Sequence, residues 1–177
     1  MDLRIEKTQK NIINAFYELR ARKPLEKITV KELCEKAQIN KSTFYSHFHD
    51  IYELSECLEN ELITSIMKDI RHPESILLDP GSFTREFFEC YLVKDDLARI
   101  LFSGTRSSLL IQKINQALKE LVASEYPEYL KNPVKMIGLS YCIFGAYHAF
   151  IENREYGDAY VVNVISRLSS NFQNKAT

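Results

Sequence analysis

Residues 28–48, with the sequence ITVKELCEKAQINKSTFYSHF, decide the expected fold because they predict two short helices joined by a tight turn. Thr29 is a suitable N-cap, since its hydroxyl can accept a hydrogen bond from a free N–H group of the first helical turn. The first helix has apolar residues at helical spacing: Val30, Leu33, Cys34 and Ala37. Gln38 and Ile39 break this period, and Asn40 can cap the second helix.

The second helix, residues 41–48, has one apolar side and one polar side. Phe44 and Phe48 lie four residues apart and anchor the helix to the core. The polar side carries donors and small groups: Lys41, Ser42, Thr43, Tyr45, Ser46 and His47. Short hydroxyl side chains permit close approach to a DNA major groove and can bond phosphates or base edges. The stretch therefore predicts a helix-turn-helix in which residues 41–48 form the recognition helix, with Thr29 as a further DNA-contact candidate.

The chain from about Asn11 to Leu58 resembles the tetracycline-repressor (TetR) family of regulators. The matching pieces are INAFYEL, TVKELCEKA and above all KSTFYSHFHDIYEL, in which Thr-Phe-Tyr precedes a His-Phe pair and an acidic residue that opens a long helix. The family usually has Gly where Gln38 stands and Lys where Ile51 stands. Gln38 implies either a backbone conformation that tolerates a side chain or some strain. Ile51 removes one expected phosphate contact. The resemblance implies a DNA-binding head followed by a ligand-binding domain.

Composition favours long helices and a DNA contact at one end only. Among 177 residues, 45% are hydrophobic, and only five Gly and five Pro supply turns. The net charge is −1, but residues 1–52 hold ten Lys/Arg against seven Asp/Glu, and residues 53–177 hold thirteen against seventeen. A basic head on an acidic body fits a protein that touches phosphates at one end.

Helical periodicity and its breaks predict an all-α fold of about nine helices. Residues 1–48 form the expected DNA-binding domain, and residues 49–177 form a helical domain for effector binding and dimerisation. A long helix that starts at Asp50 joins the two domains, since no Gly or Pro interrupts residues 51–71. The later helices are expected at residues 82–92, 95–102, 107–124, 133–154 and 158–172.

The last two expected helices predict a homodimer. The helix at residues 133–154 is apolar nearly all round, so that more than one side needs cover. Glycine and alanine keep parts of it thin, and the final helix adds an apolar seam. The interface is expected at Gly145, Ala149, Val161, Ile165, Leu168 and Phe172. Packing inside a single chain is the alternative for the same pattern.

No residues suggest catalysis, a metal site or a cofactor. The four His form no ligand constellation, and His47 and His49 point apart on a helix. No glycine-rich phosphate loop, G-x-S-x-G or H-E-x-x-H motif is present. The four Cys are widely spaced, as expected for reduced thiols in a cytoplasmic protein. The charge-free run at residues 136–151 is short for a membrane span, so no membrane partner is expected.

Aromatic residues in the second domain are candidates for a small-molecule pocket. They are Phe87, Tyr91, Phe102, Tyr141, Tyr147 and His148. Simple filling of the helical core is the alternative for each of them, and only the family resemblance favours a cavity. The expected function is thus a sequence-specific DNA-binding homodimer, a repressor released from its operator by a small-molecule effector. The other reading is a DNA-binding dimer whose helical bundle senses a partner protein or no ligand.

Overall fold

A computed structural model describes the backbone of residues 3–173 and the side chains of residues 5–171. The regular structure in this range is entirely helical, which confirms the all-α expectation. The α-helices are α1 Leu3–Arg20, α2 Val30–Ala37, α3 Lys41–Tyr45, α4 Ile51–Asp69, α5 Ser75–Leu78, α6 Pro80–Leu92, α7 Asp95–Leu101, α8 Ser107–Glu125, α9 Pro133–Glu152 and α10 Asp158–Gln173. Short 3-10 helices are η1 Leu25–Lys27, η2 Gly104–Arg106, η3 Pro127–Lys131 and η4 Arg154–Tyr156.

The chain forms two compact units. The head unit comprises residues 1–62 and 96–108, and the bundle unit comprises residues 63–95 and 109–177. The predicted DNA-binding domain, residues 1–48, lies wholly within the head unit. That unit also takes in the first part of α4 and a segment that follows α6 in the sequence.

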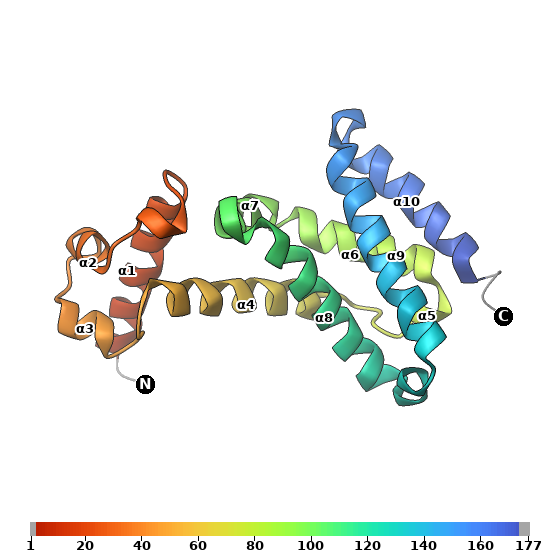
Figure 1. Cartoon of the computed structure of the whole chain (residues 1–177), viewed down its shortest axis with the longest axis horizontal. Helices are drawn as coiled ribbons and strands as arrows, with labels where there is room; N and C mark the ends of the chain where they lie inside the picture. The colour runs from red at the N-terminus through yellow and green to blue at the C-terminus, as the bar shows by residue number, and fades with distance from the viewer. Residues whose placement is uncertain (1–2, 174–177) are drawn as a thin grey trace. The chain divides into compact units, whose positions relative to one another are not determined.

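In the head unit α2 packs against α1, and α3 packs against α2 (Figure 1). Its interior is made of fully buried apolar side chains, among them Ile12, Phe16, Leu33, Phe44 and Leu54. These residues come from four different helices, and their spacing on each helix follows the helical period. The burial of one stripe per helix therefore seats α3 on the other three helices.

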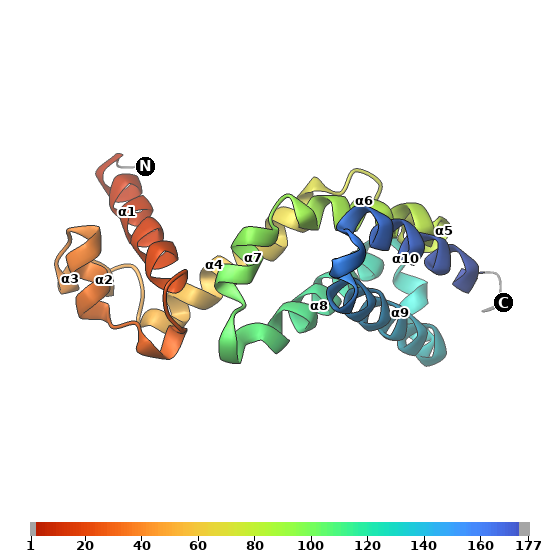
Figure 2. The ribbon, with the colours of Figure 1, turned by 90° about the horizontal axis from the view of Figure 1, so that it is seen from above.

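The bundle unit is organised around the close contact of α6 with α10, and α9 lies beside α10 (Figure 2). Gly81 permits the approach of α6, because a Cβ there would lie 1.9 Å from the Ser170 hydroxyl oxygen. An aromatic cluster fills the interior, with the Phe88 and Phe150 ring centroids 4.7 Å apart. The Tyr91 ring meets Phe150 edge-on at 6.0 Å.

Several helix ends differ from the expected ones for local reasons. Helix α6 begins at Pro80, before the expected start at residue 82, because the Asp79 carboxylate caps it by accepting from the Ser82 backbone N–H at 3.1 Å. The short helix α5 was not expected from the sequence. Helix α3 ends at Tyr45 instead of Phe48, although the Phe48 N–H still donates to the Phe44 carbonyl at 3.0 Å. The Ser46 N–H likewise donates to the Ser42 carbonyl at 3.0 Å, so the predicted recognition segment keeps helical bonds beyond the end of α3.

Candidate nucleic-acid interface

The helix-turn-helix geometry rests on one cap and one left-handed residue. The Thr29 hydroxyl accepts from the Glu32 backbone N–H at 3.2 Å, which fixes the start of α2. Gln38 ends α2 with φ 56° and ψ 46°, in the left-handed region. Behind it, the Ile39 N–H donates to the Cys34 carbonyl at 3.0 Å. The turn therefore closes with helix-capping hydrogen bonds even though Gln, not Gly, occupies the left-handed position.

Two phenylalanines orient α3. The side chains of Phe44 and Phe48 are buried, with ring centroids 5.9 Å apart. Tyr45 is 56% exposed and meets the Phe44 ring edge-on at 5.5 Å. The predicted polar side is therefore turned outward: Thr29, Lys41, Ser42, Tyr45 and Ser46 are exposed, and Thr43 and His47 are half-buried.

Lys41 differs from the neighbouring lysines in its electrostatic surroundings. Lys23, Lys31 and Lys36 each face a glutamate. Within the described part of the chain, Lys41 makes no ion pair, and its side chain is exposed. An exposed ammonium that is not paired with a carboxylate is well suited to bind a phosphate oxygen. A phosphate would have to displace the carboxylate from a lysine that is already paired.

Carboxylates near the start of α4 accept hydrogen bonds from the backbone N–H groups there. The Asp50 carboxylate accepts from the Glu53 N–H at 2.8 Å, and the His49 N–H donates to the Glu53 carboxylate. The hydrogen bond from the Glu53 backbone is the main reason why the pKa of Asp50 lies below its ordinary value. Ile51, at the position where the TetR family usually has Lys, is buried in the core and so offers no exposed charge at the start of α4. The exposed Tyr52 is the neighbouring polar group.

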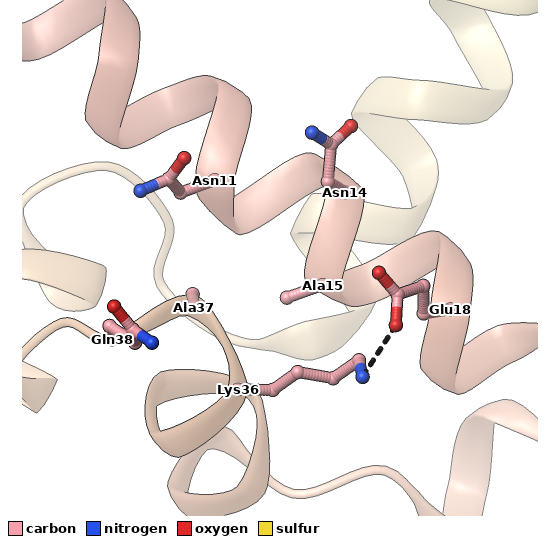
Figure 3. Close-up of a pocket in the computed structure, with 7 residues that line it drawn as sticks. All are labelled: Asn11, Asn14, Ala15, Glu18, Lys36, Ala37 and Gln38. Carbon is pink, nitrogen blue, oxygen red and sulfur yellow. Dashed lines mark ion pairs between the residues drawn. The ribbon is translucent and has the colours of Figure 1, made fainter.

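An open groove of about 250 Å³ lies between α1 and the end of α2 (Figure 3). Asn11 and Asn14 line it from α1, and Gln38 closes it from the turn. Its two charged groups face each other, since the Glu18 carboxylate lies 2.5 Å from the Lys36 ammonium. That hydrogen bond lowers the pKa of Glu18. The groove contains none of the residues predicted to line an effector pocket.

The predicted pocket residues fall into different environments. Phe87, Tyr91 and Phe102 are buried, Tyr147 is half-buried, and His148 is exposed. Tyr141 is 67% exposed on the outside of α9. Phe102 belongs to the head unit, and the other five belong to the bundle unit. Burial is the main cause of the raised pKa of Tyr91, and a hydrogen bond to Asp95 raises this pKa further. Phe87 and Tyr91 belong to the packed aromatic cluster, whereas Tyr141 and His148 face outward.

The predicted dimer residues also divide by environment. Val161 and Ile165 are buried inside the chain, with Ile165 only 5% exposed, so they offer no surface to a partner. Leu168 is 59% exposed, Gly145 is exposed and Ala149 is half-buried. The side chain of Phe172 lies outside the described residues.

Two exposed apolar stripes lie on α9 and α10, and Leu168 is the one stripe residue that was among the predicted interface residues. Together they are the α9–α10 stripes, which consist of Val134, Ile137 and Tyr141 on α9 and Tyr160, Val164 and Leu168 on α10. Each set repeats every three or four residues and so lies along one side of its helix. The helices are neighbours (Figure 2), and a Cβ at Gly138 or Gly145 would meet no atom within 4 Å. The sequence of α10 does contain this stripe as a second set of apolar residues at helical spacing, next to the set that α10 buries.

Helix α9 is the one described helix that is long and apolar enough to cross a membrane by length and composition. Its mean hydropathy reaches 1.3 over an 18-residue window, of which 11% is buried. The outward stripe of Val134, Ile137 and Tyr141 contributes to this value. An exposed apolar helix of this kind equally suits a protein interface.

The described residues hold no group of three or more His, Cys, Asp or Glu placed to bind a metal ion. Compared with family models, with curated proteins and with solved structures, the chain matches none.

Proposed function

We propose that the chain is a sequence-specific DNA-binding transcriptional regulator, a homodimeric repressor released from its operator by a small molecule. The observation that carries this proposal is the outward face of α3, anchored by Phe44 and Phe48. It offers Lys41, Ser42 and Tyr45 to solvent on a helix-turn-helix. The resemblance of residues 11–58 to the TetR family supports the same conclusion.

The chemistry of this face suits a major groove. Hydroxyl groups can bond phosphates or base edges, and the Lys41 ammonium supplies a phosphate contact that releases a counterion. The Tyr45 ring adds apolar surface next to its hydroxyl. With the α4 start closed by Asp50 and Glu53, we assign the DNA contacts of this region to α3 and to Thr29 at the start of α2.

The decisive experiment measures DNA binding by wild type, Lys41→Ala and Tyr45→Ala. A randomised duplex library selected on the wild type supplies the probe, and fluorescence anisotropy at several salt concentrations gives affinity and salt slope. Lys41→Ala should lower affinity for all sequences and reduce the salt slope by about one. Tyr45→Ala should cost about 1–3 kcal/mol if the residue reads a base, and should relax specificity.

Lys68→Ala is the matched control, because Lys68 is an exposed lysine on α4 in the bundle unit. Its affinity should equal that of the wild type. If Lys41→Ala and Tyr45→Ala also bind like the wild type with an unchanged slope, α3 is not the recognition helix.

The α9–α10 stripes support the homodimer. Large exposed apolar residues repeated along two neighbouring helices are typical of an interface. Two identical subunits would present two recognition helices to half-sites about 34 Å apart, one turn of DNA. The dimer thus gives the second unit a direct role in DNA recognition.

Release by a small molecule rests on the resemblance to the TetR family, with a partner protein or no ligand as the alternative. The side chains of Phe87, Phe88 and Tyr91 pack against one another and point to no particular effector, while the outward Tyr141 and His148 favour a macromolecular partner. Titrating a compound library against the protein–DNA complex separates these. An effector must weaken DNA binding, and operator DNA must weaken effector binding by the same factor.

A further inference from the structure

Residues 96–108 form a strap that returns to the head after α6. They comprise most of α7, the 3-10 helix η2 and the first residues of α8, and they belong to the head unit although they follow the first residues of the bundle unit in sequence. The strap buries Ala98, Leu101 and Phe102. A segment that buries its apolar side chains in this way is a structural part of the unit.

Arg20, near the end of α1, holds the strap by its backbone. The guanidinium donates to the carbonyl oxygens of Leu101 at 3.0 Å and of Ser103 at 3.2 Å. Leu101 ends α7 and Ser103 follows it, at the helix end where acceptors lack a partner within the helix and a cation is favoured. Arg20 is only 3% exposed, and burial lowers its pKa. The nearby carboxylates of Glu26 and Glu59 oppose that shift.

Glu59 on α4 and Arg106 on the strap form a second attachment. Glu59 is 0% exposed, and the Arg106 Nη2 atom lies 2.6 Å from its Oε2 atom. Arg106 Nε donates a second bond to this carboxylate, and the Ser55 hydroxyl donates to it at 2.9 Å. One residue before Arg106, the Thr105 hydroxyl donates to the Glu26 carboxylate.

The strap therefore supplies hydrogen-bond partners to two buried charged groups of the head, Arg20 and Glu59. Two arginines and two glutamates balance one another in this cluster. If the strap detaches, the Glu59 carboxylate loses Arg106 and the Arg20 guanidinium loses two carbonyl acceptors. A buried charge without its partner is strongly unfavourable, so α1 and α4 have to rearrange to hydrate both groups.

We propose that docking of the strap on α1 and α4 is a condition of DNA binding, with Arg20, Glu59 and Arg106 as positioning residues. This inference rests on the proposed function only in its last step. Helices α1 and α4 share one core with α2 and α3, so a shift of either one changes the seat of Phe44 beneath the recognition helix. The strap thereby gives a segment from the second half of the molecule control over the DNA-binding surface.

Hydrogen exchange measured by mass spectrometry tests the docking itself, without DNA. In Arg106→Met, exchange of the strap amides should rise on the order of 10²- to 10³-fold, because the buried Glu59 carboxylate loses both bonds from the Arg106 guanidinium. In the double variant Arg106→Met/Glu59→Met, exchange should return to within about tenfold of the wild type, since an apolar pair of similar size replaces the ions. Lys68→Met is the control for loss of an exposed charge.

Anisotropy with the duplex selected on the wild type tests the consequence for DNA. Arg106→Met should weaken binding at least about tenfold, and the double variant should recover most of that loss. Unchanged strap exchange in Arg106→Met overturns the docking role. Raised exchange with unchanged DNA affinity overturns the link to DNA binding.

A wild type that selects no duplex refutes the proposed function and the link to DNA, while the exchange result still decides the docking role. If Arg106→Met does not fold, Arg106→Lys and Thr105→Ala take its place. Lys keeps the charge but loses the paired geometry, and Ala removes only the bond to Glu26. Both should raise strap exchange less than Arg106→Met is expected to, and wild-type exchange in both overturns the proposal.

Discussion

At the scale of single residues, Gln38 carries the backbone cost of the helix-turn-helix. Its φ of 56° lies where only glycine is at ease, and a left-handed residue costs about 1–2 kcal/mol. Replacing Gln38 by glycine removes this strain, but it also increases the conformational entropy of the unfolded chain, which lowers stability by about 0.4–1 kcal/mol. We therefore expect Gln38→Gly to raise the free energy of unfolding by about 0.5–1 kcal/mol in urea denaturation.

Gln38→Val should change the free energy of unfolding in the opposite direction. A β-branched side chain is more strongly excluded from positive φ, so this variant should lose more than about 1 kcal/mol. If the Gly and Val variants are equally stable, the left-handed turn is not the conformation adopted in solution.

A second residue-scale prediction concerns acid unfolding. The pKa of Asp50 is lowered chiefly by the Glu53 backbone N–H, so its ionised form stabilises the start of α4. A lowered pKa in the folded state gives stability that is complete above the ordinary value of 3.8 and is lost as pH falls through the folded value. Asp50→Ser, which keeps a cap without the charge, should flatten the acid limb of a pH titration of stability.

Asp50→Ala separates the cap from the charge in the same titration. It should lower the free energy of unfolding at neutral pH, whereas Asp50→Ser should lose less. Parallel acid limbs for wild type and Asp50→Ser would mean that the Asp50 charge contributes nothing.

At the scale of helices, the contact of α6 with α10 depends on Gly81. A Cβ there would lie 1.9 Å from the Ser170 hydroxyl and 2.9 Å from the Ser166 carbonyl oxygen, a backbone atom that cannot turn aside. Gly81→Ala should therefore destabilise the protein by about 1–3 kcal/mol in thermal or urea unfolding. Adding Ser170→Ala should restore part of the loss, since it removes only the nearer atom.

Gly138→Ala is the control for helix propensity. Gly138 lies inside α9, and a Cβ there meets no atom of the chain within 4 Å. This change should stabilise the isolated helix by about 0.5–1 kcal/mol. Equal effects at Gly81 and Gly138 would argue against close packing of α6 on α10.

The helices show how far the sequence leads and where it stops. Apolar period, proline and capping residues predict most helices to within a few residues, because these signals are local. The period of α10 does not reveal which of its two apolar sides, Ile165 or Leu168, packs inside the chain. Only the position of α6 decides that. The strap was missed altogether, since Glu59 and Arg106 lie 47 residues apart and charged residues usually predict solvent exposure.

At the scale of the whole molecule, the α9–α10 stripes predict a dimer that one glutamate should break. Leu168→Glu places a charge in the proposed interface, and we expect the dissociation constant to rise about 30-fold or more, the cost of an interface hot spot. Sedimentation equilibrium measures the change, and circular dichroism should show a folded chain.

Ile165→Glu distinguishes the interface from the core of the single chain. Ile165 is buried beside Ser166 on the inner side of α10, so a glutamate there should unfold the bundle unit instead of separating subunits. A wild type that sediments as a monomer at micromolar concentration would leave the stripes without the proposed partner.

The strap also bears on how the protein is made. Residues 1–62 leave the ribosome before residue 108, and at about 5–20 residues per second the interval lasts about 2–9 seconds. During that interval the nascent head has every helix of its helix-turn-helix but lacks Arg106 beside Glu59. Synthesis therefore delays the finished recognition surface until the middle of the chain has emerged, and a ribosome stalled before residue 108 should display a head that is susceptible to protease.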